Sequence, residues 1–244
     1  MSAPWFYAPA PAWRGPEVVL DLDESRHALT VLRIAPPDVL TITDGSGTVA
    51  RCSAARVDDG RLVAEILERD QRPRPRPEVV VYQGAAKGSK VDGVVERLAE
   101  LGVAEVSVFG SQRTVVRWDE SKSEHLEDRW AAIARSAAKQ SQSPWVMGTG
   151  PPQRWDEVLG RVALEPCVVV LWEGASLPLR TALLEGVDRV ALVVGPEGGL
   201  EATEAEALAD AGGQLVSLGP QILRTENAPV VATSAVLFHY GLIG

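Results

Sequence analysis

Two glycine-containing loops near the carboxyl end constrain the fold of this 244-residue chain more strongly than any other feature. The first loop, GPEGGL at residues 195–200, directly follows the β-prone run RVALVV at 189–194. The second, LGPQILRTENAP at 218–229, continues from the β-prone run QLVSL at 214–218. Open α/β sheets bind their ligands at the carboxyl ends of parallel strands. We therefore predict that both loops leave the same edge of a parallel sheet, from adjacent strands, and form a small-molecule pocket.

The residue types in these loops suit a ligand that is partly apolar and partly cationic. Glycine lets the backbone approach a ligand closely or adopt positive φ angles. Ile222 and Leu223 supply apolar surface, and the carboxylates of Glu197 and Glu226 tolerate a positive charge. A third phrase, LWEGA at 171–175, ends another β-prone run. Convergence of the three loops would provide backbone donors and acceptors for an adenine edge.

Length and composition favour a cytoplasmic protein with one large or two ordinary domains. Cys52 and Cys167 are the only cysteines, and they form neither a CxxC motif nor a Cys/His cluster, so we expect no disulfide framework and no zinc site. The amino-terminal segment lacks the features of a signal peptide, and no apolar run reaches about 18 residues. We therefore expect neither export nor a membrane span.

The net charge of -9 weakens, without excluding, a role in binding nucleic acid. Residues 1–77 hold ten arginines against eleven acidic residues, a net charge of -1, and residues 78–244 carry the remaining -8. Phosphate binding depends on local clusters of positive charge rather than on the total. The arginine-rich first part is therefore compatible with a basic RNA-binding face.

The segment DQRPRPRPE, which begins at residue 70, marks the predicted domain boundary, because alternating proline and arginine favour an extended, stiff chain. We predict a mainly β, barrel-like domain at residues 1–72, a linker at 73–78 and an α/β domain at 79–244. The two domains are expected to differ in pattern, with short strands and turns before the linker and alternating strands and helices after it.

Local patterns predict individual elements within these domains. Asp44-Gly45 and Asp59-Gly60 are candidate hairpin turns of the first domain. In the second domain, apolar residues within 91–101 recur at helical spacing, and this helix is expected to end at Gly102. Further strands are predicted at 79–84, 105–110 and 167–172, and further helices at roughly 124–141 and 227–240.

Several common site motifs are absent from the sequence. The phrase GAAKGSK at 84–90 has three residues between its glycines, whereas a phosphate loop requires four. No dinucleotide fingerprint, serine hydrolase elbow or zinc protease motif is present. The three histidines are scattered, so we expect no metal site. A nucleotide hydrolase therefore ranks below the other functions considered.

Longer phrases carry a resemblance to a known family. They are RHALTVLRIAPPDVLTITDGSG at 26–47, GAAKGSKVDGVVERLAELGV at 84–103, and the loops GPEGGL and LGPQILRTE. The chain resembles the RsmE-type 16S ribosomal RNA uracil-N3 methyltransferases of the SPOUT class, which use S-adenosylmethionine. The resemblance implies an α/β SPOUT domain with a deep trefoil knot and a PUA-like amino-terminal β-barrel. It also implies a homodimer that acts on the small ribosomal subunit. From the residues themselves we expect no membrane and no metal partner.

The same resemblance implies that S-adenosylmethionine binds at the three loops. The contacts that we predict are Leu171, Trp172 and Glu173 in the first phrase, Gly195, Pro196, Glu197 and Gly198 in the second, and Leu218, Gly219, Ile222, Leu223 and Arg224 in the third.

Arg224 and Glu226 are the candidate catalytic residues. Methyl transfer requires the donor carbon to lie in line with the uracil nitrogen, so most of the catalytic task is positioning. The imide nitrogen must lose its proton, and a nearby cation favours the resulting anion. Arg224 is the candidate for stabilising that charge or orienting the base, although a structural role in bridging the loops is equally compatible with the sequence. Glu226 is also compatible with a plain helix cap, and no general base is evident.

RNA contacts are predicted in both domains. If these residues bind phosphates, RNA affinity should fall linearly with the logarithm of salt concentration. The alternative function is a catalytically silent RNA-binding assembly factor of the same architecture. It is suggested by Gln221, which stands where arginine is common in the family, and by the departure from the family pattern at Gln142 to Ser143. The predicted RNA-binding residues are Arg26, His27 and Arg33 in the first domain, and Lys87, Lys90, Arg113 and Arg117 in the second.

Overall fold

Residues 3–112 and 118–244 are described by a computed structural model of the chain. The chain divides into two units, one formed by residues 1–74 with 135–146 and the other by residues 75–134 with 147–244. Arg113 and Arg117, two of the predicted RNA-binding residues, lie outside the described residues. No helix in the described ranges combines the length and hydrophobicity needed to cross a lipid bilayer.

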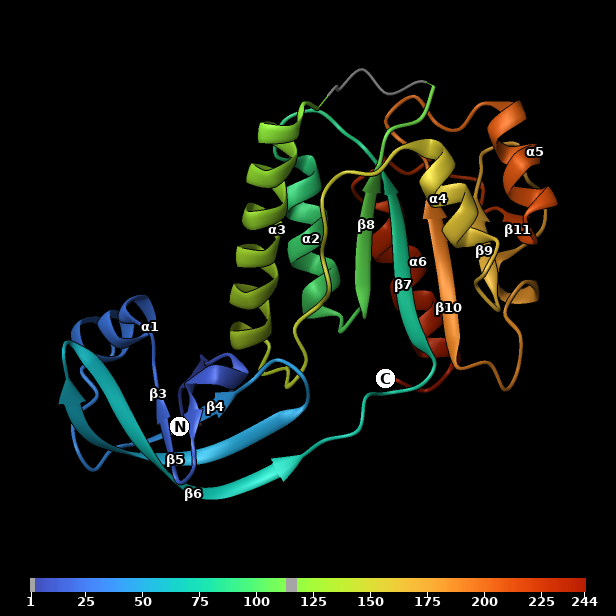
Figure 1. Ribbon diagram of the computed structural model, residues 1–244. Coiled ribbons are helices and arrows are strands. Elements are labelled where there is room, and N and C mark those ends of the chain that lie inside the picture. Colours follow the sequence, from blue (N-terminus) through green and yellow to red (C-terminus); the bar gives the residue numbers. More distant parts are fainter. Residues whose placement is uncertain (1–2, 113–117) are drawn as a thin grey trace. The chain divides into compact units, whose positions relative to one another are not determined.

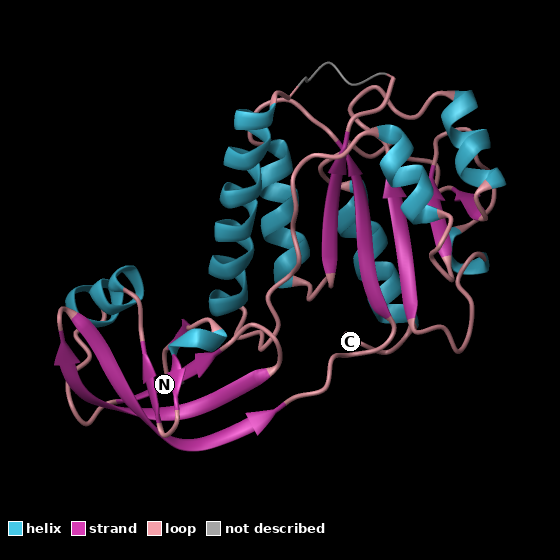
Figure 2. Cartoon of the chain, viewed as in Figure 1, coloured by secondary structure: helices cyan, strands magenta, loops and turns pink. Residues whose placement is uncertain are grey.

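The first unit is mainly β, as its turn-rich sequence predicts. Its strands form one sheet in the order β1-β4-β5-β6-β3-β2, mostly antiparallel (Figure 2). Short helical segments, η1 (Ala10–Ala12), α1 (Leu22–Arg26) and the π-helical η2 (His27–Val31), connect the early strands. The strands are β1 (Trp5–Tyr7), β2 (Trp13–Arg14), β3 (Glu17–Val19), β4 (Val39–Thr43), β5 (Thr48–Asp58) and β6 (Arg61–Gln71).

The long hairpin of β5 and β6 dominates this sheet. Asp59 and Gly60 form its two-residue turn with φ angles of 47° and 75°, the positive values that a type I′ turn requires. Asp44 begins the turn between β4 and β5, where its carboxylate accepts hydrogen bonds from the backbone N–H groups of Ser46 and Thr48. Both predicted hairpin turns are therefore confirmed. The alternating inward residues of these strands, such as Leu40, Ile42 and Leu62, form the apolar core of the unit.

Residues 135–146 differ from the expected division, because they belong to the first unit although we placed all of 79–244 in the second. The backbone of this segment pairs with the turn before β5: the N–H of Gly47 donates to Pro144 O at 3.0 Å, and Trp145 forms an antiparallel bridge with Ser46. Lys139 also forms an ion pair with Glu24. These backbone bonds join residues that are distant in sequence, so local patterns gave no sign of them.

The second unit is built on a five-stranded parallel sheet in the order β11-β9-β10-β7-β8 (Figure 1). Parallel sheets are covered on both faces, and these strands accordingly read as continuous apolar runs such as Val79–Val81 and Val168–Val170. The strands are β7 (Glu78–Gly84), β8 (Glu105–Phe109), β9 (Val168–Leu171), β10 (Arg189–Val194) and β11 (Gly213–Val216).

Helices cover both faces of this sheet (Figure 1). On one face α2 packs with α6, and α6 contacts β7 and β10; on the other, α4 and α5 pack together over Val80, Tyr82 and Val193. The long helix α3 starts in the second unit and ends in the first. The helical elements are α2 (Lys90–Glu100), α3 (Glu120–Gln140), α4 (Trp155–Val162), η3 (Leu179–Thr181), α5 (Ala202–Asp210) and α6 (Ala228–His239).

One expectation about the sheet is wrong. The strands that precede the two glycine loops, β10 and β11, are not adjacent, because β9 lies between them and pairs with both. The four residues of β9 are apolar and largely buried, which suits a central position. The consequence favours the predicted pocket, since the loop after β9 now lies between the two glycine loops at the carboxyl edge of the sheet.

Candidate cofactor and catalytic site

A cavity of about 1480 Å³ opens at the carboxyl ends of β9, β10 and β11. Its walls come from the three loops that follow these strands and from one side of α6. The volume exceeds the range of roughly 300–1,000 Å³ that is usual for a small-molecule site, so it can hold a nucleoside-sized ligand with space beside it. The cavity is lined by all twelve predicted cofactor residues: Leu171, Trp172, Glu173, Gly195, Pro196, Glu197, Gly198, Leu218, Gly219, Ile222, Leu223 and Arg224.

The loop at 195–200 is held against the end of β7 by a backbone contact that excludes any side chain. A Cβ atom on Gly84 would lie 2.3 Å from Pro196 N and 2.5 Å from Gly195 C. Within the loop, the N–H of Gly199 donates to Pro196 O at 2.9 Å, and Gly199 has a φ of 73°. Glycine at positions 84 and 199 therefore fixes the shape of this wall.

A chain of hydrogen bonds joins the same loop to the third one. The Gln83 side chain is fully buried, and its Nε2 donates to Thr225 Oγ1 at 3.0 Å. The Thr225 hydroxyl in turn donates to Gly195 O at 2.8 Å. Gln83 and Thr225 were not predicted as site residues. Thr225 lies in the LRTE phrase, which was the available signal, whereas Gln83 ends an apolar strand and gave none.

Lys90 pairs with the two predicted carboxylates. It starts helix α2, donates a hydrogen bond to Glu197 Oε1, and lies 3.8 Å from Glu226 Oε2. The bond from Lys90 is the main cause that lowers the pKa of Glu197, and the same bond raises the pKa of Lys90. We predicted an RNA contact for Lys90, but its side chain is engaged within the site. Its proximity to the loops was not evident from the sequence because its partners are more than a hundred residues away.

The two candidate catalytic residues take different positions. Arg224 lines the cavity and is exposed, and within the described ranges its side chain has neither a hydrogen bond nor an ion pair. Its guanidinium is therefore available to a ligand. Glu226 is not part of the cavity lining; its side chain is 18% exposed and faces Lys90. The arrangement makes Arg224 the stronger candidate for contact with the reacting base.

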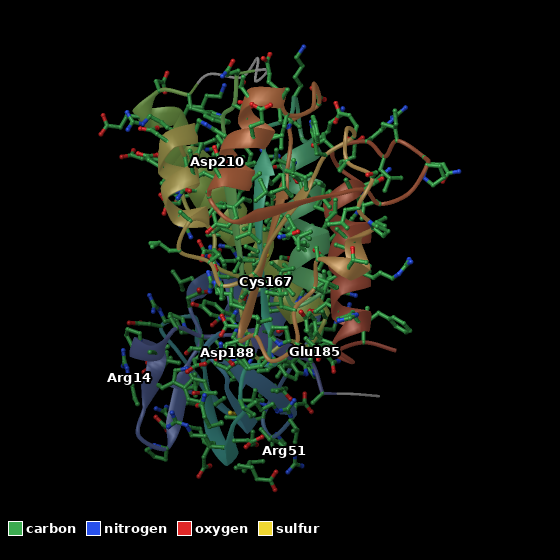
Figure 3. All side chains as sticks on the ribbon, turned by 90° about the vertical axis from the view of Figure 1, so that its right-hand side faces the viewer. Arg14, Arg51, Cys167, Glu185, Asp188 and Asp210 are labelled. Atoms are coloured by element: carbon green, nitrogen blue, oxygen red, sulfur yellow. The ribbon has the colours of Figure 1, made fainter. Side chains whose placement is uncertain are left out.

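Apart from Lys90, the predicted RNA-binding residues that the structure describes lie on surfaces. Arg26 and His27 are exposed at the junction of α1 and η2, and Arg33 follows with a φ of 55°. Other exposed arginines, including Arg14 and Arg51, project from the same unit (Figure 3). Lys87, in the second unit, is also exposed.

The chain is similar to known methyltransferases along its length. Residues 72–237 match the family model described as an RNA methyltransferase domain. A ribosomal RNA small subunit methyltransferase E from Mycobacterium bovis is 37% identical, covering 97% of this chain and 92% of that protein.

Two solved structures are also similar to this chain. A ribosomal RNA small subunit methyltransferase E from Neisseria gonorrhoeae, bound to S-adenosyl methionine, has a TM-score of 0.87 at 30% identity, with 97% of this chain and 98% of that chain covered. A methyltransferase from Legionella pneumophila, in complex with the cofactor SAM, has a TM-score of 0.88 at 27% identity, with 98% of both chains covered. The predicted α/β fold class, without its knot, and the predicted enzyme class and cofactor are confirmed by these matches. With its three-loop cavity and these relatives, the chain belongs to the ribosomal RNA small subunit methyltransferase E family.

Proposed function

We propose that this protein transfers the methyl group of S-adenosylmethionine to N3 of a uridine in the decoding region of 16S ribosomal RNA, on the assembled small subunit. The observation that carries the proposal is the convergence of three loops on one cavity, whose lining includes Arg224, an arginine without a hydrogen bond or ion pair to any described residue. The relatives named above supply the class of RNA and the methyl donor. Action on ribosomal subunits implies a cytoplasmic protein.

The cavity residues fit the methyl donor in chemistry. Leu171, Leu218 and Leu223 offer apolar surface to an adenine ring, and the loop backbones offer donors and acceptors to its edge. The carboxylates of Glu173 and Glu197 suit the positively charged groups of the methionine part. When bound, S-adenosylmethionine supplies an electrophilic methyl group. We also propose that the loops form the trefoil knot typical of the family, which would keep this cavity rigid.

Arg224 performs the electrostatic part of the proposed reaction. The N3 position of uracil carries a proton that must leave before the nitrogen can attack. A guanidinium beside the base stabilises the negative charge that remains on the ring, and a site prepared in advance does so without reorganisation. The sign of the effect is fixed, because a neighbouring cation lowers the pKa of an acid.

We propose that the first unit holds the RNA and that the protein works as a homodimer. Arg26, His27 and Arg33 offer exposed donors for phosphates. Two apolar side chains on the cavity side of α6 support the homodimer, because a second copy would cover them: Val231 is 45% and Phe238 70% exposed. A monomer in sedimentation at micromolar concentration would remove the dimer from the proposal.

The decisive experiment is methylation of isolated small subunits from a strain that lacks the enzyme, followed by mass spectrometry of the nucleosides. We expect 3-methyluridine with the wild-type protein and a rate lowered roughly 100-fold with Arg224→Ala, the scale of losing one charge-stabilising donor. Free 16S RNA, tested in parallel, should be a poorer substrate. Absence of methyl transfer from a protein that binds S-adenosylmethionine would favour the silent assembly factor instead.

A further inference from the structure

We infer that Thr225 and Gln83 are positioning residues that set the direction of Arg224 in the cavity. This inference rests on the proposed function for its readout in activity. Its structural basis is the chain of hydrogen bonds that runs from the end of β7 through Thr225 to the loop after β10.

The direction of each bond in this chain is determined by its partners. Nε2 of Gln83 donates to Gly84 O at 2.8 Å, and since a carbonyl oxygen only accepts, the amide nitrogen must be on this side. The same nitrogen donates its second proton to Thr225 Oγ1. The single hydroxyl proton of Thr225 is therefore left for Gly195 O. Each N–H and O–H donor in this hydrogen-bond network has an acceptor. Only one orientation of the Thr225 side chain makes both of its hydrogen bonds.

Thr225 is placed to control Arg224 because it is the next residue in the chain. Arg224 O accepts hydrogen bonds from the N–H groups of Asn227 at 2.8 Å and Ala228 at 3.0 Å, which fix the backbone on the α6 side. On the other side the loop is solvent-exposed, with Ile222 89% exposed. Thr225 directly follows Arg224 at the end of this exposed stretch. Its hydroxyl donates a hydrogen bond to Gly195 O, and Gly195 lines the cavity. Without that bond, the backbone hydrogen bonds that hold Arg224 among the described residues would come only from α6.

Gln83 is a costly residue unless it serves this purpose. Its side chain has no exposure, and its Oε1 accepts no hydrogen bond within the part of the chain that the structure describes. Burial of an amide with an unmet acceptor costs free energy that an apolar side chain would avoid. The fixed geometry of Thr225 is a benefit that offsets this cost.

The test compares single-turnover methylation of small subunits at saturating S-adenosylmethionine. Thr225→Val removes the hydroxyl with little change of shape and should lower the rate by roughly 10- to 100-fold, the scale expected for small misplacements of catalytic groups. Thr225→Ser keeps the hydroxyl and should recover most of the rate. The matched control is Thr233→Val, because Thr233 is fully buried in α6 and its hydroxyl has no hydrogen-bond partner among the described residues. That control should keep the wild-type rate.

A double-mutant comparison separates positioning of Arg224 from general damage. If Thr225 acts through Arg224, Thr225→Val should have little further effect in a protein that already carries Arg224→Ala. An equal fold-loss in both backgrounds, or a wild-type rate for Thr225→Val alone, would overturn the inference. Gln83→Met, which removes both amide donors, provides a second variant and should reproduce the loss if Thr225→Val does not fold.

Amide hydrogen exchange decides the inference even if the wild-type protein fails to methylate subunits, an outcome that would refute the proposed function alone. Thr225→Val and Gln83→Met should each speed exchange of residues 219–227 by at least about tenfold, because the loop loses a tether. Unchanged exchange in both variants would overturn the positioning role.

Discussion

Lys90 Nζ lies 3.8 Å from Glu226 Oε2 while it also donates a hydrogen bond to Glu197, so one cation serves carboxylates from two cofactor loops. Without Lys90, these loops would carry two negative charges with no shared partner. The pair therefore ties the start of α2 to the site.

We predict that Lys90→Gln weakens the affinity for S-adenosylmethionine by roughly three- to tenfold, a modest effect because the pair is partly exposed. Calorimetry without RNA measures this directly. Lys122→Gln is the matched control, since Lys122 is an exposed lysine of α3 outside the cavity lining and should leave the cofactor affinity unchanged. If Lys90 instead contacts only RNA, Lys90→Gln will bind the cofactor like the wild type and lose RNA affinity in a salt-dependent way.

Gly84→Ala should damage the cavity, because the new Cβ would lie 2.3 Å from Pro196 N. The loop must shift, and we expect at least about a tenfold loss of cofactor affinity together with about 1–3 kcal/mol of stability. Calorimetry and urea denaturation measure the two effects. Gly93→Ala, in helix α2, is the control: its Cβ would approach no atom closer than 3.9 Å, so it should be neutral or stabilising by about 0.5–1 kcal/mol. Similar behaviour of both variants would contradict the close approach at Gly84.

An ion-pair network in the second unit should make stability depend on pH. Burial tends to raise the pKa of Glu105, but the hydrogen bond from Arg161 and the charge of Arg189 outweigh it and lower the pKa. A lowered pKa stabilises the fold above the unfolded value of about 4.3, and this contribution disappears as the pH falls through the folded value.

Glu105→Gln should therefore reduce the free energy of unfolding by about 1–2 kcal/mol at neutral pH. The difference from the wild type should shrink as the pH falls below the lowered pKa of Glu105, where both side chains are neutral. Urea denaturation at neutral pH and at a series of acidic pH values measures it. Asp156→Asn is the control, because its pair with Arg154 is 70% and 74% exposed and should contribute little. A difference that persists unchanged in acid would exclude the charge of Glu105 as its source.

Gly47→Ala should destabilise the first unit, because the new side chain would collide with the segment 135–146. The new Cβ would lie 2.5 Å from the Trp145 ring and 2.8 Å from Arg72 O, at a φ of 96°. We expect a loss of more than about 2 kcal/mol in thermal or urea unfolding. Gly15→Ala separates the two causes, because its φ is 60° but no atom lies within 4 Å of its Cβ. Equal losses would show that backbone strain alone, rather than the contact with Trp145, is responsible.

Hydrophobic patterns within short segments correctly predicted individual helices and strands of the second unit. The helical spacing of Val91, Val94 and Leu98 matches α2, and the apolar runs match β7 and β9. The position of β9 between β10 and β11 was missed, because strand order depends on pairing between distant segments. Helices α4 and α5 were missed as well. Each is short, and its stability comes from packing on the sheet rather than from a strong repeat of its own.

The site shows the same division between local and distant information. The three loops were predicted because each follows a β-prone run and contains glycine. Residues of all three loops line one cavity. The side chains that organise these loops were not predicted. Gln83 meets Thr225 across 142 positions, and Lys90 meets Glu197 across 107, so no spacing rule connects them. Lys90 was predicted as an RNA contact because it is a basic residue in a family-like phrase.

The return of residues 135–146 to the first unit has a consequence for synthesis of the protein. A nascent chain of which only residues 1–74 have left the ribosomal tunnel still lacks residues 135–146, in which Pro144 and Trp145 pair with Gly47 and Ser46. Strand β7 is translated next, but its partner β10 is translated later than residues 135–146. The six strands of the first unit can therefore pair before its last segment has been translated, but the unit cannot yet be complete. The first unit becomes complete only when well over half of the polypeptide has been translated.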